Sequence, residues 1–114
     1  MLKKQNRLTK RKDFDRLFHN CQAKYYGNLL GVRLVANNLS YNRFGFMVGH
    51  RFCGQAVGRN LVRRRLSALV RQDLPQLKTG YDVVVLMLAK QLPAGYIELR
   101  QELLEAWKRL KLIV

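Results

Sequence analysis

The first hydrophobic residues of the chain recur with the spacing of an amphipathic helix. Phe14, Leu17 and Phe18 stand at positions i, i+3 and i+4, so a helix places them on one face. Thr9 is a suitable N-cap residue, and we therefore predict a helix that begins after Thr9 and ends at about Asn20.

Three later segments have the composition of β-strands. Residues 25–36 are mostly apolar, with Gly31 as a weak point or a position of close approach. Apolar residues alternate over residues 43–48, and the polar residues between the two segments are typical of a turn, so we predict an antiparallel hairpin. Residues 81–89 are predicted to form a strand, whose run Val83-Val84-Val85-Leu86 is apolar on both faces, which is typical of a central strand covered on both sides.

Two further helices are expected in the second half of the chain. The first covers residues 56–72 and ends before Leu74-Pro75, because proline cannot continue the helical ladder. The second covers residues 96–110 and has an apolar face. The predicted order is αββαβα, so the expected fold class is α+β, with helices packed on a small sheet of about four strands. We expect a single domain over residues 1–114, with residues 1–7 loosely ordered.

The large positive charge of the chain indicates an anionic partner. Lys and Arg number 22 against 7 Asp and Glu, which gives a formal net charge of +15. Residues 1–72 hold 16 of the basic residues and two of the acidic ones, so the excess charge lies in the first two thirds. Such a charge favours nucleic acid or an anionic membrane surface as partner, although it also serves general solubility.

Other sites and locations are not supported by the sequence. No run of about 18 apolar residues is present, so we expect no membrane partner and a cytoplasmic protein. Cys21 and Cys53 are then expected to be free thiols. The spacings His19-x-Cys21 and His50-x-x-Cys53 are poor for zinc, and no metal site is expected.

One predicted helix carries most of the candidate chemistry. Val62, Leu66 and Leu69 stack on one side, which we expect to dock on the sheet. Arginine grips phosphates through paired N–H bonds, so the remaining basic face suits nucleic acid, RNA or DNA. A solvated face neutralised by acidic partners is excluded, because no acid lies between Asp15 and Asp73. The basic face consists of Arg59 and Arg63 on one flank, Asn60, Arg64, Ser67 and Arg71 in a neighbouring stripe, and Arg65 on the other flank.

The same stretch resembles a known family. The residues Ala56-Val57-x-Arg59-Asn60-x-Val62-Arg63-Arg64 resemble the signature of the bacterial ribonuclease P protein subunit. The segments Phe44-Gly45-Phe46-Met47-Val48 and Asn6-Arg7-Leu8, followed by Asp13-Phe14, are similar to the same family. The resemblance covers almost the whole chain.

The resemblance implies a fold and a function. The fold would be an α-β sandwich with a left-handed crossover around the arginine-rich helix. The protein would pair with a catalytic RNA that removes the 5′ leader of precursor tRNA, as the protein component of an endoribonuclease. The RNA and its Mg²⁺ would perform the hydrolysis, so no catalytic residue, no cofactor bound by the protein alone and no obligate protein partner are expected.

The resemblance also implies which residues bind RNA. Arg59, Asn60, Arg63 and Arg64 would contact the catalytic RNA, and the nearby charges of Arg65, Arg71 and Arg51 would support them. Phe14 and Phe18 match the helix positions that line the leader cleft, where Arg11 and Lys12 flank them. Aromatic platforms beside basic groups suit single-stranded RNA. The alternative is that both rings are simply core residues, and partial burial satisfies both interpretations.

The chain departs from the family pattern at three places. Leu61 stands where the family usually has arginine, and Ser67-Ala68 replaces an Arg-Glu pair. The loop over residues 50–54 replaces a more lysine-rich segment, and Arg51 and Arg65 are candidates for the missing charge. Two other functions are weighed beside the ribonuclease P subunit: a ribosomal or general RNA-binding protein, and a DNA-binding architectural protein.

Overall fold

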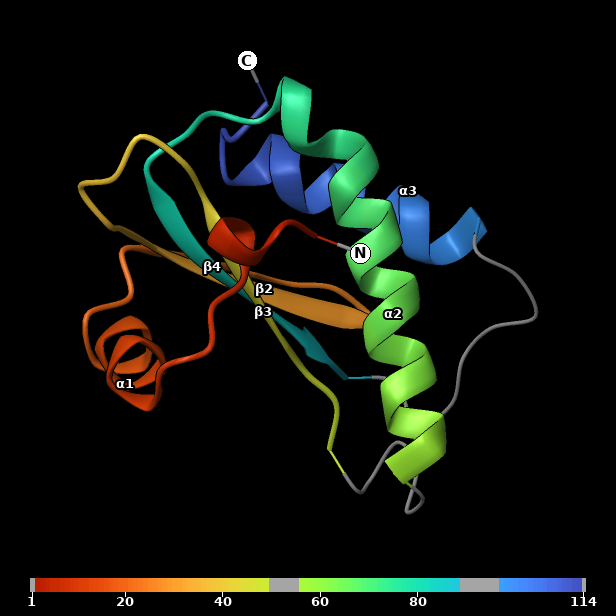
Figure 1. Ribbon diagram of the computed structural model, residues 1–114. Helices are drawn as coiled ribbons and strands as arrows, with labels where there is room; N and C mark the ends of the chain where they lie inside the picture. Colours follow the sequence, from red (N-terminus) through yellow and green to blue (C-terminus); the bar gives the residue numbers. More distant parts are fainter. Residues whose placement is uncertain (1, 50–55, 89–96, 114) are drawn as a thin grey trace.

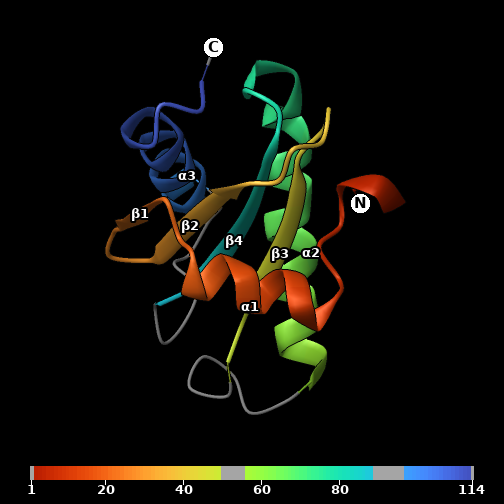
Figure 2. The same ribbon diagram turned by 90° about the vertical axis from the view of Figure 1, so that its left-hand side faces the viewer.

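The protein is built on a four-stranded mixed sheet with helices on both faces. The computed structural model describes residues 2–49, 56–88 and 97–113. Its strands lie in the order β1-β2-β4-β3, with α1 on one face and α2 and α3 on the other (Figures 1 and 2). The elements are η1 (Lys4–Asn6), α1 (Arg11–His19), β1 (Ala23–Tyr26), β2 (Leu30–Ala36), β3 (Arg43–Met47), α2 (Ala56–Asp73), η2 (Leu74–Gln76), β4 (Tyr81–Met87) and α3 (Ile97–Arg109). The α+β class and the sheet of four strands are confirmed.

The predicted pairing of the strands is wrong in two respects. The segment 25–36 forms two strands, because the chain turns back at Gly27 and β1 pairs antiparallel with β2. The hairpin expected between 25–36 and 43–48 is replaced by the insertion of β4, which pairs antiparallel with β2 and parallel with β3.

The composition of β4 explains this order. Val83, Val84 and Val85 are all fully buried, so both faces of β4 are covered by apolar groups. A local hairpin of β2 with β3 would leave β4 at an edge, with one row of peptide groups unpaired. The turn between β2 and β3 forms hydrogen bonds with the start of β4. The Asn42 side chain accepts from Tyr81 N at 2.8 Å and donates to the Lys78 carbonyl at 2.7 Å.

The parallel strands β3 and β4 are joined by a crossover through α2. In Figure 2, α2 lies behind the sheet, β3 runs downward and the chain enters β4 to its left, so the crossover is left-handed. This hand is rare among parallel strand connections, because strand twist favours the opposite one. It is the hand that the family resemblance implies.

The two faces of the sheet support separate hydrophobic clusters. Val83 and Val85 belong to the cluster beneath α2 and α3. This cluster contains Val62, Leu66 and Leu69, which were predicted to dock on the sheet, together with Leu99, Leu103, Ala106 and Trp107. On the other face, Val84 packs with Leu8, Leu17 and Val35 beneath α1. The alternation of side chains along β4 thus divides the core into two layers.

A buried polar contact joins the ends of α2 and α3. The helix α2 ends at Asp73, directly before Leu74-Pro75 as predicted. The Asp73 carboxylate is 2% exposed and accepts hydrogen bonds from Trp107 Nε1 at 2.9 Å and Arg100 Nη2 at 3.0 Å. The only acidic residue of α2 is therefore turned inward and does not neutralise its basic face.

The segment before α1 packs against the sheet and α2. Leu2 is 3% exposed, and its backbone N–H donates to Ser67 Oγ at 3.3 Å. Leu8 N donates to the Phe44 carbonyl at 2.9 Å, so residues 7 and 8 lie along β3. Ser67, which helical periodicity assigned to the solvent stripe, is buried because this distant segment covers it.

Candidate nucleic-acid interface

The basic face of α2 is solvent-accessible in the structure. Asn60, Arg64 and Arg71 are exposed, while Arg59, Arg63 and Arg65 are half-buried. Arg63 Nη1 donates to Asn60 Oδ1 at 2.8 Å, which holds the two side chains together and leaves the amide N–H groups of Asn60 directed to other partners. Arg51 lies outside the described residues.

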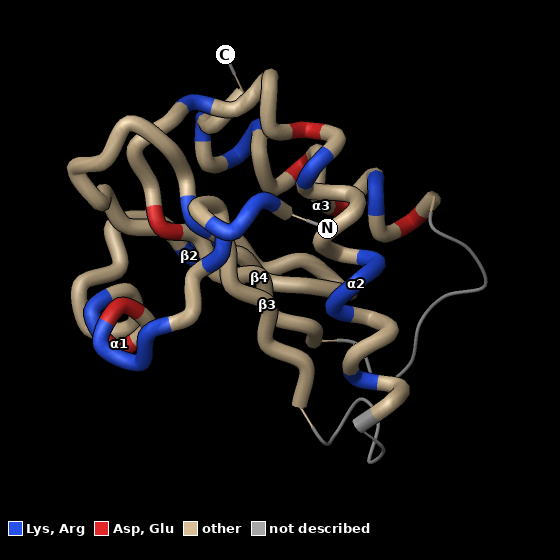
Figure 3. The backbone as a smooth tube through the Cα atoms, viewed as in Figure 1, with Lys and Arg blue, Asp and Glu red and all other residues tan. Residues whose placement is uncertain are grey.

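The charges of this face are not neutralised from within α2. Arg64 and Arg71 form no ion pair with any residue that the structure describes. Figure 3 shows basic positions along α2 and α1, whereas three of the acidic residues lie on α3. Adjacent guanidinium groups repel one another unless anions approach them, so this face favours phosphate groups. Leu61 is 44% exposed on the same helix.

The aromatic residues of α1 are half-buried over the opposite face of the sheet. The Phe14 ring lies against Gly45, where a Cβ atom would come within 2.5 Å of the ring. Phe14 and Phe18 both pack on the cluster around Leu17 and Val84, yet neither is fully covered. Both rings therefore contribute to the core and keep part of their surface accessible to solvent.

A hollow opens beside these rings. It has a volume of about 400 Å³ and lies between α1 and the end of β3, where Met47 is 42% exposed. Arg11 supplies a cation at its rim, while Lys12 is exposed but does not line it. We refer to this hollow as the α1 groove; it is lined by Thr9, Arg11, Phe14, Asp15, Phe18 and Met47.

A second hollow connects α1 to α2. It has a volume of about 260 Å³ and an apolar floor, and Arg7, Arg63 and Arg64 contribute to its lining. It shares Thr9 and Phe14 with the α1 groove. The basic face of α2 and the aromatic residues of α1, which are far apart in the sequence, thus border one continuous surface.

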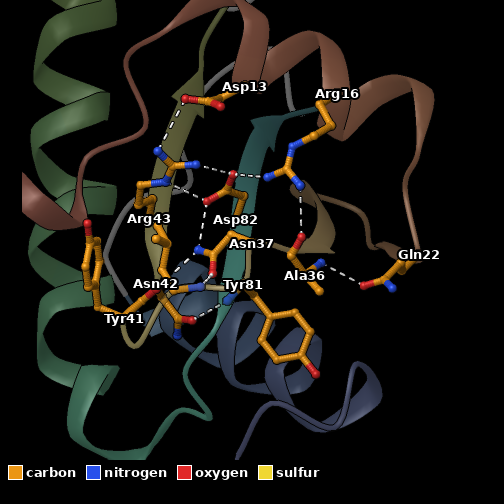
Figure 4. A network of polar contacts seen from close by, with 11 residues as sticks. Asp13, Arg16, Gln22, Ala36, Asn37, Tyr41, Asn42, Arg43, Tyr81 and Asp82 are labelled. Carbon is orange, nitrogen blue, oxygen red and sulfur yellow. Dashed lines mark hydrogen bonds and ion pairs between the residues drawn. The ribbon is translucent and has the colours of Figure 1, made fainter.

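The position of α1 over the sheet depends on a buried carboxylate. Asp82 of β4 is fully buried and accepts from Arg16 Nη2 of α1 at 2.7 Å (Figure 4). Arg43 of β3 binds the same carboxylate with two nitrogens, Nε at 2.8 Å and Nη2 at 2.7 Å, and Asn37 Nδ2 donates at 3.0 Å. Arg43 Nη1 also reaches Asp13 of α1 at 3.3 Å, so both arginines link α1 to the sheet.

This network sets the pKa of Asp82. Burial by itself raises the pKa of the carboxyl, but hydrogen bonds from Arg43 and Asn37, the charge of Arg43 and the hydrogen bond from Arg16 together lower it below its ordinary value of 3.8. The hydrogen bond to Asp82 correspondingly raises the pKa of Arg43. The sequence analysis missed this group, although an acid inside an apolar strand was the signal that could have revealed it.

The residues considered for zinc do not form a described cluster. His50 and Cys53 lie outside the described residues, and Cys21 is a free thiol whose Sγ donates to the Ala23 carbonyl at 3.1 Å. Within the described ranges, no three His, Cys, Asp or Glu residues are grouped as metal ligands would be. No helix in the same ranges has the length and apolar character needed to cross a bilayer.

Comparisons with known proteins identify relatives of the chain. A sequence profile of the family described as Ribonuclease P matches residues 2–111. The chain is 36% identical over 104 residues to the ribonuclease P protein component of Pseudanabaena sp. (strain PCC 6903), covering 90% of this chain and 89% of that protein. It is 32% identical over 108 residues to the protein of the same name from Alkaliphilus metalliredigens (strain QYMF), covering 95% and 96%.

Solved structures share the fold. The RNase P protein from Thermotoga maritima superposes with a TM-score of 0.80 at 28% identity and covers 90% of this chain and 96% of its own. The RNase P protein from Staphylococcus aureus superposes with a TM-score of 0.81 at 20% identity, covering 96% and 98%, which supports the fold alone.

Replacement of Asp82 should destabilise the protein in a pH-dependent way. Asp82→Asn removes the counter-charge of Arg16 and Arg43, and we expect a loss of about 3 kcal/mol in the free energy of unfolding at neutral pH. Because the folded-state pKa of Asp82 lies below 3.8, the stabilisation is complete above that value and is lost as the pH falls through the lowered pKa. Urea unfolding across a pH series measures the difference between the two proteins.

The control for this experiment is Asp15→Asn, on an exposed position of α1 without an ion pair among the described residues. Its stability should stay within about 0.5 kcal/mol of the parent protein. A difference between Asp82→Asn and the parent that persists unchanged into strong acid would show that the ionised carboxylate is not the stabilising group.

Proposed function

Because this chain belongs to the ribonuclease P protein family, we propose that it binds the catalytic RNA along α2 and holds the 5′ leader of precursor tRNA in the α1 groove. Membership makes the chain a protein component of an endoribonuclease that works with an RNA subunit. The observation that carries the finer proposal is the surface that joins the basic face of α2 to the α1 groove through Phe14.

Each part of this surface has a physical role in the proposal. Arg64 and Arg71 neutralise phosphates of the RNA subunit, and the counterions released add to affinity. Asn60, held by Arg63, offers amide N–H groups to a base edge, a ribose hydroxyl or a phosphate. In the α1 groove, the half-buried rings of Phe14 and Phe18 provide platforms for unpaired leader bases, while Arg11 attracts the leader phosphates.

The chemistry of cleavage is assigned to the RNA subunit. In this proposal the hydrolysis is performed by the RNA with its bound Mg²⁺, and the protein contributes cations and substrate positioning rather than a catalytic side chain. Cations supplied by the protein reduce the Mg²⁺ needed to bring two polyanions together. A cytoplasmic site of action is part of the same proposal.

Reconstitution tests the proposed function directly. Addition of this protein to the catalytic RNA of the same organism should restore 5′ cleavage of precursor tRNA at a Mg²⁺ concentration where the RNA alone is slow. The yield of mature 5′ ends measures this effect. Cleavage that does not change with the protein would contradict the proposal, whereas competition by duplex DNA as effective as that of structured RNA would favour a DNA-binding protein.

Arg64→Ala combined with Arg71→Ala should weaken binding of the catalytic RNA. If each arginine neutralises one phosphate, the slope of log affinity against log salt concentration should decrease by roughly two. The measurement is the dissociation constant over a salt series. Lys108→Ala with Lys111→Asn is the matched control, because it removes two charges from α3 and the turn after it, and asparagine tolerates the positive φ of 58° at position 111. An equal decrease in the control would indicate non-specific attraction.

Phe14→Ala should weaken binding of precursor tRNA more than binding of mature tRNA. The loss of one stacking platform is expected to lower the affinity of the holoenzyme for precursor tRNA by about tenfold. Leu17→Ala is the matched control, because Leu17 lies on the same helix but is fully buried and supports only the fold. Equal losses for both tRNAs in Phe14→Ala would mean that the ring acts only in packing.

A further inference from the structure

The segment that precedes α1 carries basic residues to the side of α2. Its apolar and amide side chains anchor it on the rest of the protein, while its basic side chains face solvent. The buried residues are Leu2, Asn6 and Leu8, and the exposed basic residues are Lys3, Lys4 and Arg7. Figures 1 and 3 show this segment in front of the sheet, with its beginning next to α2. The function proposed above gives the segment no role.

Hydrogen bonds fix this segment and orient Arg7. Leu2 N donates to Ser67 Oγ on α2 at 3.3 Å. Asn6 Nδ2 donates to the Asn42 carbonyl at 2.8 Å. Arg7 Nε donates to the Leu2 carbonyl at 3.0 Å. The two terminal nitrogens of Arg7 form no hydrogen bond with the residues that the structure describes, so they are available to an anion.

The hollow of about 260 Å³ between this segment, β3 and α2 has two chemically distinct parts. We refer to it as the α2 hollow. Its floor is apolar, and it includes the buried Leu8 and the half-buried ring of Phe46. Arg7, Arg63 and Arg64 also line it, and none of its described lining residues is acidic. An apolar floor beside three cations fits a ligand with an apolar ring and an anionic group.

A buried hydroxyl also lines the α2 hollow. Ser67 is 7% exposed, and its Oγ accepts the N–H of Leu2. The O–H of Ser67 itself has no acceptor among the described residues. A buried hydroxyl without an acceptor lacks a hydrogen bond that water would supply. A ligand with an acceptor atom on its ring, such as the nitrogen or carbonyl of a nucleobase, would satisfy it.

We propose that the α2 hollow binds one unpaired nucleotide of the catalytic RNA. The proposal rests on the function proposed above. The base lies on the apolar floor against the Phe46 ring and accepts from the Ser67 hydroxyl. Arg7 and Arg64 bind the phosphates on either side of this nucleotide. An unpaired nucleotide fits because its base is free to leave the stack and its backbone carries the complementary charge.

The size and position of the hollow limit the ligand further. Pockets for drug-sized ligands occupy about 300–1,000 Å³, so a hollow of about 260 Å³ has room for a single base. The leader is assigned to the α1 groove, on the other side of Phe14. The cations of the α2 hollow come from α2 and the N-terminal segment, where the catalytic RNA is proposed to bind. The nucleotide is therefore assigned to the catalytic RNA.

Chemical probing of the catalytic RNA tests this inference. Acylation of 2′-hydroxyl groups reports the mobility of each nucleotide, so the parent protein should suppress the reactivity of one unpaired nucleotide besides those held along α2. Ser67→Leu fills the hollow and removes the hydroxyl. In this variant that nucleotide should regain its reactivity, and the affinity for the catalytic RNA should fall by about tenfold. Protections that depend on Arg71 should persist, which shows that the variant is folded and bound.

Arg7→Ala is an independent test that leaves the floor of the hollow unchanged, and it decides the question if Ser67→Leu does not fold. It should release the same nucleotide and lower the slope of log affinity against log salt concentration by roughly one. Lys4→Ala is the matched control, because Lys4 is an exposed cation of the same segment that does not line the hollow. It should leave the nucleotide protected.

The outcomes separate this inference from its alternatives. A nucleotide that stays protected in Arg7→Ala and in folded Ser67→Leu would overturn the inference while leaving the proposed function intact. Unchanged protection of the catalytic RNA, together with a loss of affinity for precursor tRNA but not for mature tRNA, would assign the hollow to the leader and also overturn the inference. A parent protein that leaves no footprint on the catalytic RNA would instead contradict the proposed function itself.

Discussion

A buried carboxylate holds the helix α1 in place on the sheet. Asp82 is fully covered near the start of the inner strand β4, and an ionised carboxylate in that position is stable only with charged partners. Arg43 supplies a two-nitrogen contact from the neighbouring strand, and Arg16 supplies another from α1. The helix α1 is therefore held on the sheet by charge as well as by apolar packing, and the placement of Phe14 and Phe18 follows from it.

The same strand determines the topology. Because β4 is apolar on both faces, it occupies the interior of the sheet between β2 and β3. The chain must then pass over the sheet between β3 and β4, and α2 makes that passage. The helix α2 consequently has one face on the core and one face in solvent. Its arginines lie on the solvent side, whereas Asp73 is buried and accepts a hydrogen bond from Trp107.

Glycine and the N-terminal segment shape the surface that connects the two helices. Gly45 and Gly31 each lie beneath an aromatic ring, so the α1 face of the sheet presents rings close to the backbone. Residues 2–9 cross from α1 to α2 along β3 and bury Ser67, which brings Arg7 close to Arg63 and Arg64. Ser67 thus has a structural role here, since its small hydroxyl receives the N–H of Leu2.

The sequence by itself determined those features that depend on neighbouring residues. Periodicity predicted the apolar side of α2, its end before Leu74-Pro75 and the central character of β4, because helix and strand geometry repeat over a few positions. Resemblance predicted the family and the hand of the crossover. Only the tertiary structure decided the strand order, the burial of Ser67, the pairing of Asp82 with Arg16 and Arg43, and the approach of Arg7 to Arg63 and Arg64. Each of these joins residues that lie far apart in the chain or face one another across strands, and such contacts depend on which surfaces the whole chain can bury together.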